Sequence, residues 1–189
     1  DGAASRRSMS TAQWAWMAVA VVLVFWMVGG YNRVVALRTR IGEAVAQLDD
    51  GMRQRTEAAA PLVATLRTPL AGEQGALDTL AAATQAAATA LAALRQKPAS
   101  REAASAYQRA EGAWAAAASR VRALVELHPA LASDEAVAPS LKALVQGDER
   151  IAFARRLFNE AAAAYDEAVQ QFPTSLLAWL FGLKVAGRL

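Results

Sequence analysis

A stretch of seventeen consecutive residues without a formal charge, Trp14 to Gly30, lies near the start of this 189-residue chain. The apolar run extends to residues 12–31, and a helix that rises about 1.5 Å per residue covers about 30 Å over that length. This is the thickness of the hydrocarbon core of a bilayer. The stretch therefore predicts a transmembrane helix over residues 12–31, preceded by a short flank over residues 1–11.

Aromatic side chains gather toward the ends of this run, at Trp14, Trp16, Phe25, Trp26 and Tyr31. Amphipathic rings prefer the headgroup level of a bilayer, so the distribution favours a membrane anchor over the core helix of a soluble protein. The alternative is a cleaved secretory signal, whose apolar core is usually about 7–15 residues long and precedes a small-x-small site. This run is longer and lacks that site, so we predict an uncleaved anchor.

The charges that flank the anchor leave its orientation open. Two arginines precede it, Arg6 and Arg7, and three follow it, Arg33, Arg38 and Arg40. The positive-inside rule compares such counts, and two against three decides little. We predict a single-pass membrane protein whose larger part lies on an undecided side.

The composition of residues 32–172 favours helix throughout, because Ala, Leu, Glu, Gln and Arg dominate and β-branched residues are few. Apolar residues recur at steps of three and four in four segments, which end near Arg67, Arg95, Leu127 and Phe172, and Ser100 is the predicted N-cap of the third. The predicted stripes are Val34, Leu37, Ile41, Ala44, Leu48, Arg55 and Leu62; Leu77, Leu80, Thr84, Ala87, Leu91 and Leu94; Ala103, Ala106, Ala110, Ala113, Ala117, Leu124 and Leu127; and Leu141, Leu144, Asp148, Ile151, Arg155, Phe158, Ala162, Tyr165, Val169 and Phe172.

Four striped helices with short connections bury their stripes in an antiparallel up-down bundle. The predicted fold is therefore all-α, with the membrane helix continuing into a four-helix bundle over residues 32–172. A long coiled-coil dimer is the alternative. After four passes the chain returns to the membrane, where the apolar tail 173–189, with Leu177, Trp179 and Phe181, either lies in the headgroup region or covers the end of the bundle.

The sequence beyond the anchor resembles the LemA family. The resemblance rests on Gly30-Tyr31-Asn32, Gln47-Leu48-Asp49, Ala154-Arg155, Phe158-Asn159, Phe172-Pro173 and Phe181-Gly182, in order and spacing. It implies a bacterial membrane protein with one span, an antiparallel helical bundle and no established reaction. The Tyr-Ala-x-His-Glu stretch common in the family is replaced here by residues 69–73, so a metal or acid-base role for that histidine does not carry over.

Reaction chemistry is poorly represented in this sequence. The chain has no cysteine and one histidine, His128, which precedes a proline in a predicted turn. Gly72-Glu73-Gln74-Gly75 lacks the Lys and Ser/Thr of a phosphate-binding loop. The net charge of +3 is spread out, without the Lys/Arg runs that favour nucleic-acid binding. We therefore predict no enzyme activity, no cofactor, no metal and no nucleic-acid partner.

Four polar residues interrupt the predicted apolar stripes or lie beside them: Arg55, Asp148, Arg155 and Asn159. If the first and fourth helices are neighbours, Asp148 can lie between the two guanidiniums and Asn159 or Tyr165 can complete the hydrogen bonds, so that the set fixes register. The alternative is a charged pocket for a ligand or partner.

Long helices at a membrane without reaction chemistry favour a scaffold or assembly protein that associates with itself. Its predicted partners are the lipid bilayer and further copies of the chain. The family resemblance permits this role, since some relatives are linked with forming membrane compartments. It also suggests an accessory subunit of a membrane protease or transport complex. A ligand-sensing membrane receptor is a third hypothesis, compatible with continuous helix from the anchor into the bundle.

Overall fold

The computed structural model describes residues 11–171, 175 and 185–189. Its helices are α1 (Thr11–Leu66), the 3-10 turn η1 (Ala71–Glu73), α2 (Gln74–Gln96), α3 (Arg101–Glu126), the short α4 (Pro129–Ala132) and α5 (Ala138–Gln170). No strand occurs among these described residues. The predicted all-helical class is confirmed.

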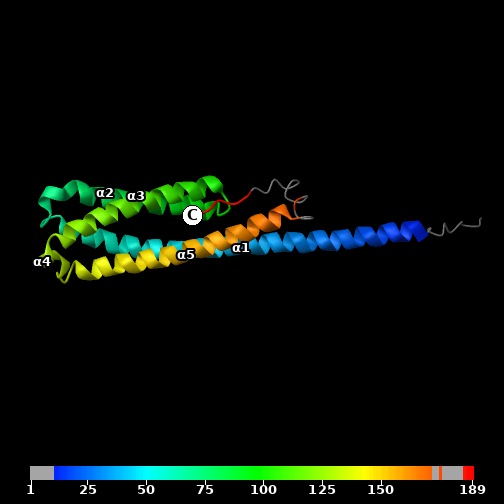
Figure 1. Ribbon diagram of the computed structural model, residues 1–189, viewed down its shortest axis with the longest axis horizontal. Coiled ribbons are helices and arrows are strands. Elements are labelled where there is room, and N and C mark those ends of the chain that lie inside the picture. The colour runs from blue at the N-terminus through cyan, green and yellow to red at the C-terminus, as the bar shows by residue number, and fades with distance from the viewer. Residues whose placement is uncertain (1–10, 172–174, 176–184) are drawn as a thin grey trace, which may run out of the picture.

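Helix α1 changes its surroundings along its 56 residues. Between Thr11 and Val34 no residue of α1 is buried, whereas from Val34 on a buried side chain recurs every three or four positions. The first part of α1 projects beyond the other helices (Figure 1). Its most apolar window has a mean hydropathy of 1.8 and no buried residue, so this part is a candidate membrane span.

The predicted anchor residues all lie on this projecting part. Trp14, Trp16, Phe25, Trp26 and Tyr31 are between 48% and 75% exposed. The segment Ala71–Gln96 also has the length and hydropathy of a span, but a third of its window is buried against other helices. Burial of Leu77, Leu80, Leu91 and Leu94 gives α2 the role of a core helix.

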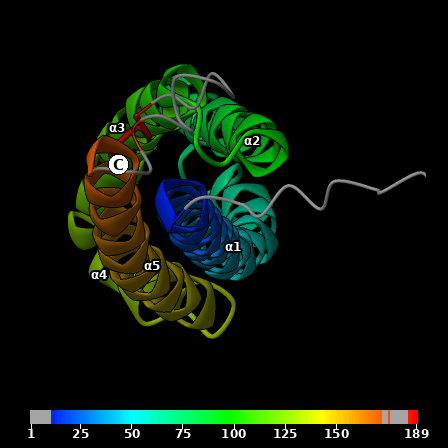
Figure 2. The same ribbon diagram turned by 90° about the vertical axis from the view of Figure 1, so that its right-hand side faces the viewer.

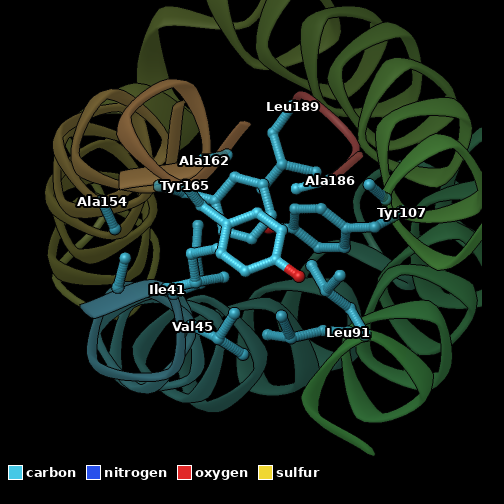
Figure 3. Close-up of a cluster of buried hydrophobic side chains, with 14 of the residues drawn as sticks. Ile41, Val45, Leu91, Tyr107, Ala154, Ala162, Tyr165, Ala186 and Leu189 are labelled. Atoms are coloured by element: carbon cyan, nitrogen blue, oxygen red, sulfur yellow. The ribbon is translucent and has the colours of Figure 1, made fainter. Parts of the chain in front are cut away.

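The second part of α1 packs along α5, while α2 contacts both α1 and α3. An end-on view shows the four long helices around a common interior (Figure 2). The backbones of α3 and α5 stay farther apart than those of the other neighbours. Residues 185–189 occupy part of the gap between them (Figure 3).

The predicted stripes are confirmed in α1 and α2 and differ by one position in α3. The buried residues of α3 are Ala104, Tyr107, Glu111, Trp114, Ala117, Ala118, Val121 and Val125. Ala113 and Leu127, which we expected inside, are exposed. The larger side chains of Tyr107 and Trp114 bury more apolar area than alanine, so their face turns inward.

The helix ends agree closely with the sequence. Ser100 caps α3, with its hydroxyl accepting a hydrogen bond from the Ala103 N–H at 3.3 Å. The short α4 was not anticipated, and α5 begins at Ala138, three residues before the predicted stripe. The tail residues Leu177, Trp179 and Phe181 lie outside the described residues.

Candidate functional site

Arg55 lies at the centre of a buried ionic layer, where it is only 2% exposed. Its Nη1 and Nη2 donate to the two carboxylate oxygens of Glu111 on α3, at 2.6 and 3.2 Å. Its Nε and Nη2 donate to Oδ1 of Asp148 on α5, at 3.1 and 2.9 Å. One guanidinium thus joins three helices through charge-assisted hydrogen bonds.

The layer extends to α2 through an aromatic ring. The guanidinium of Arg55 lies over the ring of Trp114, 3.6 Å from its centroid, in cation–π geometry. The indole N–H of Trp114 donates to the hydroxyl of Thr84 at 3.1 Å, and this hydroxyl donates to the carbonyl of Leu80. All four long helices therefore meet in one hydrogen-bonded layer.

Two glycines allow α1 and α5 to approach closely beside this layer. A Cβ on Gly51 would lie 2.7 Å from the Ile151 side chain and 3.3 Å from the Gly147 carbonyl oxygen. A Cβ on Gly147 would lie 3.3 Å from the Gly51 carbonyl oxygen and 3.4 Å from the Cβ of Arg55. The close approach sets the distance at which Arg55 reaches Asp148.

Burial changes the acid-base properties of the residues around Arg55. Loss of hydration raises the pKa of Asp148 above its ordinary value, and this outweighs the attraction of Arg55. Burial also raises the pKa of Tyr107, and repulsion by Glu111 adds to the shift. The Tyr107 hydroxyl is buried without a hydrogen-bond partner among the described residues.

The balance between desolvation and attraction in these ion pairs indicates that the layer has a structural role. Desolvating an ion pair costs about as much as its attraction returns, but removing one partner leaves an uncompensated buried charge. The layer therefore fixes which helix faces which, and at what register, more than it raises stability.

The structure brings together only part of the predicted polar set. Arg55 and Asp148 are paired, but the second guanidinium near Asp148 belongs to Arg122 on α3, with Nη2 3.9 Å from Oδ2. Arg155 makes no hydrogen bond or ion pair with any residue in the described part of the chain. It lies two turns beyond Asp148 on α5, and both side chains line the same hollow without forming an ion pair with each other.

Asn159 has a different partner from the one we expected. Its side-chain amide accepts from the N–H of Leu189 at 2.8 Å and donates to the carbonyl oxygen of the same residue at 2.7 Å. Asp166, two turns further along α5, accepts from the N–H of Ala186 at 2.6 Å and pairs with Arg188 at 2.8 Å. Residues 185–189 are thereby held in the gap between α3 and α5.

A hollow of about 410 Å³ lies between α3 and α5 beside the ionic layer, and Arg155 in its wall is one turn of α5 from Asn159. Its walls include Arg55, Glu111, Trp114, Arg122, Asp148 and Arg155. No cluster of three His, Asp or Glu side chains in the described ranges is arranged to hold a metal ion. His128 is exposed, and its Nδ1 lies 2.7 Å from the carbonyl oxygen of Leu124 at the end of α3.

Sequence reasoning missed Glu111, Trp114, Arg122 and the two glycines. Gly51 continues the predicted stripe of Leu37 and Ala44 by seven residues, so its position was readable even though its contact with Gly147 was not. Glu111 and Trp114 are buried on α3, each one position after an alanine of the predicted stripe, so the prediction placed them on an outer face.

An all-helical protein with an exposed apolar span and a polar interior layer is the class that this architecture defines. The model of the LemA family matches residues 44–188, and the chain belongs to that family. It is also similar to the magnetosome protein MamQ of Magnetospirillum gryphiswaldense, with 35% identity over 75 residues, which are 40% of this chain and 28% of that protein. Magnetosome protein MamQ 2 of Paramagnetospirillum magneticum is 32% identical over 77 residues, which are 41% of this chain and 28% of that protein. The chain thus aligns with little more than a quarter of each relative's length.

Proposed function

We propose that this chain is a non-enzymatic, single-pass membrane protein that serves as a scaffold or assembly factor and associates with itself. In this proposal the part of α1 before Val34 crosses the bilayer, and the rest of α1 forms an antiparallel four-helix bundle with α2, α3 and α5. The contrast within α1 carries the proposal, because one continuous helix is bare and apolar in its first part and packed in its second.

A membrane-extraction experiment tests the anchor. The full chain is expected to stay in the membrane fraction after alkaline carbonate washing. Val22 and Val24 are 65% and 54% exposed, and arginine at both positions costs about 5–7 kcal/mol of insertion free energy at the centre of a span. V22R/V24R should therefore move into the washed supernatant.

The matched control places arginine on the exposed surface of the packed part of α1. Ala46 is exposed there, so A46R should remain in the membrane fraction. Retention of V22R/V24R alongside A46R would contradict the assignment of the span.

Self-association draws support from large apolar side chains that stay exposed outside the anchor. Val145 and Phe153, two turns apart on α5, are 42% and 51% exposed, which offers a surface for another helix. The mass of the full chain extracted in mild detergent tests this. A homo-oligomer that V145E/F153E reduces to a monomer supports a self-associating scaffold. Stable co-purification of a different subunit instead favours an accessory role in a protease or transport complex.

A further inference from the structure

We propose that the hollow between α3 and α5 binds an acidic side chain on an extended segment of a partner protein, with Arg155 and Arg122 as its cationic ligands. This site is separate from the anchor and from the exposed α5 face, so it does not depend on the proposed self-association. It uses a stretch between α3 and α5 that residues 185–189 do not line.

The charges around the hollow are unbalanced. Three guanidiniums line it, those of Arg55, Arg122 and Arg155, against the two carboxylates of Glu111 and Asp148. Both carboxylates are already engaged by Arg55, and the contact of Arg122 with Asp148 is long, at 3.9 Å. One further negative charge would neutralise the wall, and a single carboxylate supplies it, whereas a phosphate dianion would exceed it.

Arg155 is the residue best placed to receive this carboxylate. It is half-buried, lies one turn from Asn159 on the side of the ionic layer, and has no ion pair within the described ranges. A half-buried guanidinium without a carboxylate partner is unusual beside a layer in which the neighbouring arginine makes four hydrogen bonds.

The same gap already shows how it holds an extended chain. Residues 185–189 run antiparallel to α5, from Asp166 toward Asn159, and the two side chains bind main-chain groups of Ala186 and Leu189. Figure 3 shows Ala186 and Leu189 between Tyr107 of α3 and the side chains of α5. Gly187 lies so close to α3 that an added Cβ would be 2.5 Å from the Cβ of Ala104. Main-chain recognition in a narrow gap suits an extended segment.

The hollow lies between the same two helices, beside the turn of α5 that precedes Asn159, and its volume of about 410 Å³ accommodates a few residues of chain. A segment lying there in line with residues 185–189 would pass Arg155 first and Arg122 afterwards. The partner is therefore identified by its chemistry, as an extended segment that carries one Asp or Glu.

The test uses the full chain in nanodiscs with ¹⁵N-labelled tryptophan. The indole N–H of Trp114 reports on the wall of the hollow and is assigned by its loss in W114F. The probe is acetyl-Ala-Ala-Asp-Ala-Ala-amide, and the same peptide with Asn in place of Asp is its uncharged twin. We expect a saturable shift of the Trp114 signal with the Asp peptide and none at the same concentration with the Asn peptide.

Arginine variants locate the binding. R155Q and R122Q should each lower the affinity for the Asp peptide about tenfold or more. This is the loss expected for one charge-assisted hydrogen bond. Arg156 is exposed on the neighbouring face of α5, so R156Q changes the net charge equally and should leave binding within about twofold. Because Arg155 has no ion-pair partner among the described residues, R155Q is expected to fold, and a melting curve checks this.

Several results would overturn the proposal. These are no shift with the Asp peptide, equal shifts with both peptides, or equal binding by R155Q, R122Q and R156Q. Tighter binding of inorganic phosphate than of the Asp peptide would show a different anion chemistry. Tighter binding of succinate would show that the site takes a free carboxylate rather than a peptide segment.

Discussion

The gap between α3 and α5 is closed in two different ways along its length. Around Arg55, side chains from all four long helices close it with charges and hydrogen bonds. Nearer the candidate membrane span, residues 185–189 close it with a short piece of main chain against Tyr107, Ala162 and Tyr165 (Figure 3). Between the two closures lies the hollow beside Arg155.

The two closures should differ in whether the packing of the helices depends on them. The Arg55 layer is made of groups that lose their partners only if the helices separate, so its disruption should be felt throughout the fold. The segment 185–189 is held by two side chains of α5 and can leave while the helices stay packed. Global unfolding and local opening are therefore expected to respond to different substitutions.

The largest effect is expected when Arg55 is replaced. R55M leaves Glu111 and Asp148 partly or wholly buried without their cation, which destabilises by about 3–5 kcal/mol when a buried pair is broken. Circular-dichroism melting of the full chain in detergent should show a clear drop in the transition temperature.

R53M is the matched control for this substitution. Among the described residues Arg53 pairs with Asp50 alone, and both side chains are about two-thirds exposed, so its loss should change stability by less than about 1 kcal/mol. Equal melting of R55M and R53M would mean that the buried layer does not hold the helices together.

A smaller and more local effect is expected at the other closure. N159A removes two hydrogen bonds to Leu189, each worth about 0.5–1.5 kcal/mol, without leaving a buried charge. Hydrogen exchange should therefore accelerate at the amides of Leu189 and Ala186, while amides of the helix interiors keep their protection. The exposed neighbour Glu160 provides the control E160A, which should leave both rates unchanged.

The two closures also differ in how much of them the sequence could reveal. Arg55 and Asp148 were identifiable because each interrupts a stripe of larger apolar residues on α1 or α5. Glu111 was missed because alanines lie on several faces of α3, so their periodicity carries little information about which face is buried. Asn159 was recognised as a polar residue near the stripe, but its partner is main chain from a distant segment, and side-chain patterns do not report main-chain partners.

The overall class was easier to predict than these contacts. The apolar run before Val34 and the stripes of α1 and α2 depend on local periodicity, which a single sequence contains. The spacing of α3 and α5 depends on how Trp114, Tyr107 and Arg55 fit together in three dimensions. Two glycines without side chains, Gly51 and Gly147, set part of that fit and carry almost no periodic signal.

The smallest effect is expected for D148N, which removes the charge of Asp148 in the Arg55 layer but keeps a hydrogen-bond acceptor. Because burial raises the pKa of Asp148, the folded state binds a proton more readily than the unfolded state does between the ordinary pKa and the raised one. The contribution of Asp148 to stability is therefore highest at low pH and is lost as pH rises through that window. D148N keeps an acceptor oxygen and stays neutral at every pH.

D148N should accordingly lie within about 1 kcal/mol of the unaltered chain, and its stability relative to that chain should increase as pH rises from about 3.5 to 7. Paired urea titrations across this range measure the difference directly. The opposite slope, in which D148N becomes less stable relative to the unaltered chain as pH rises, would show that attraction to Arg55 outweighs the cost of burying the charge. In that case the ionic layer would stabilise the fold as well as set its register, and the contrast with the segment 185–189 would be greater than we infer.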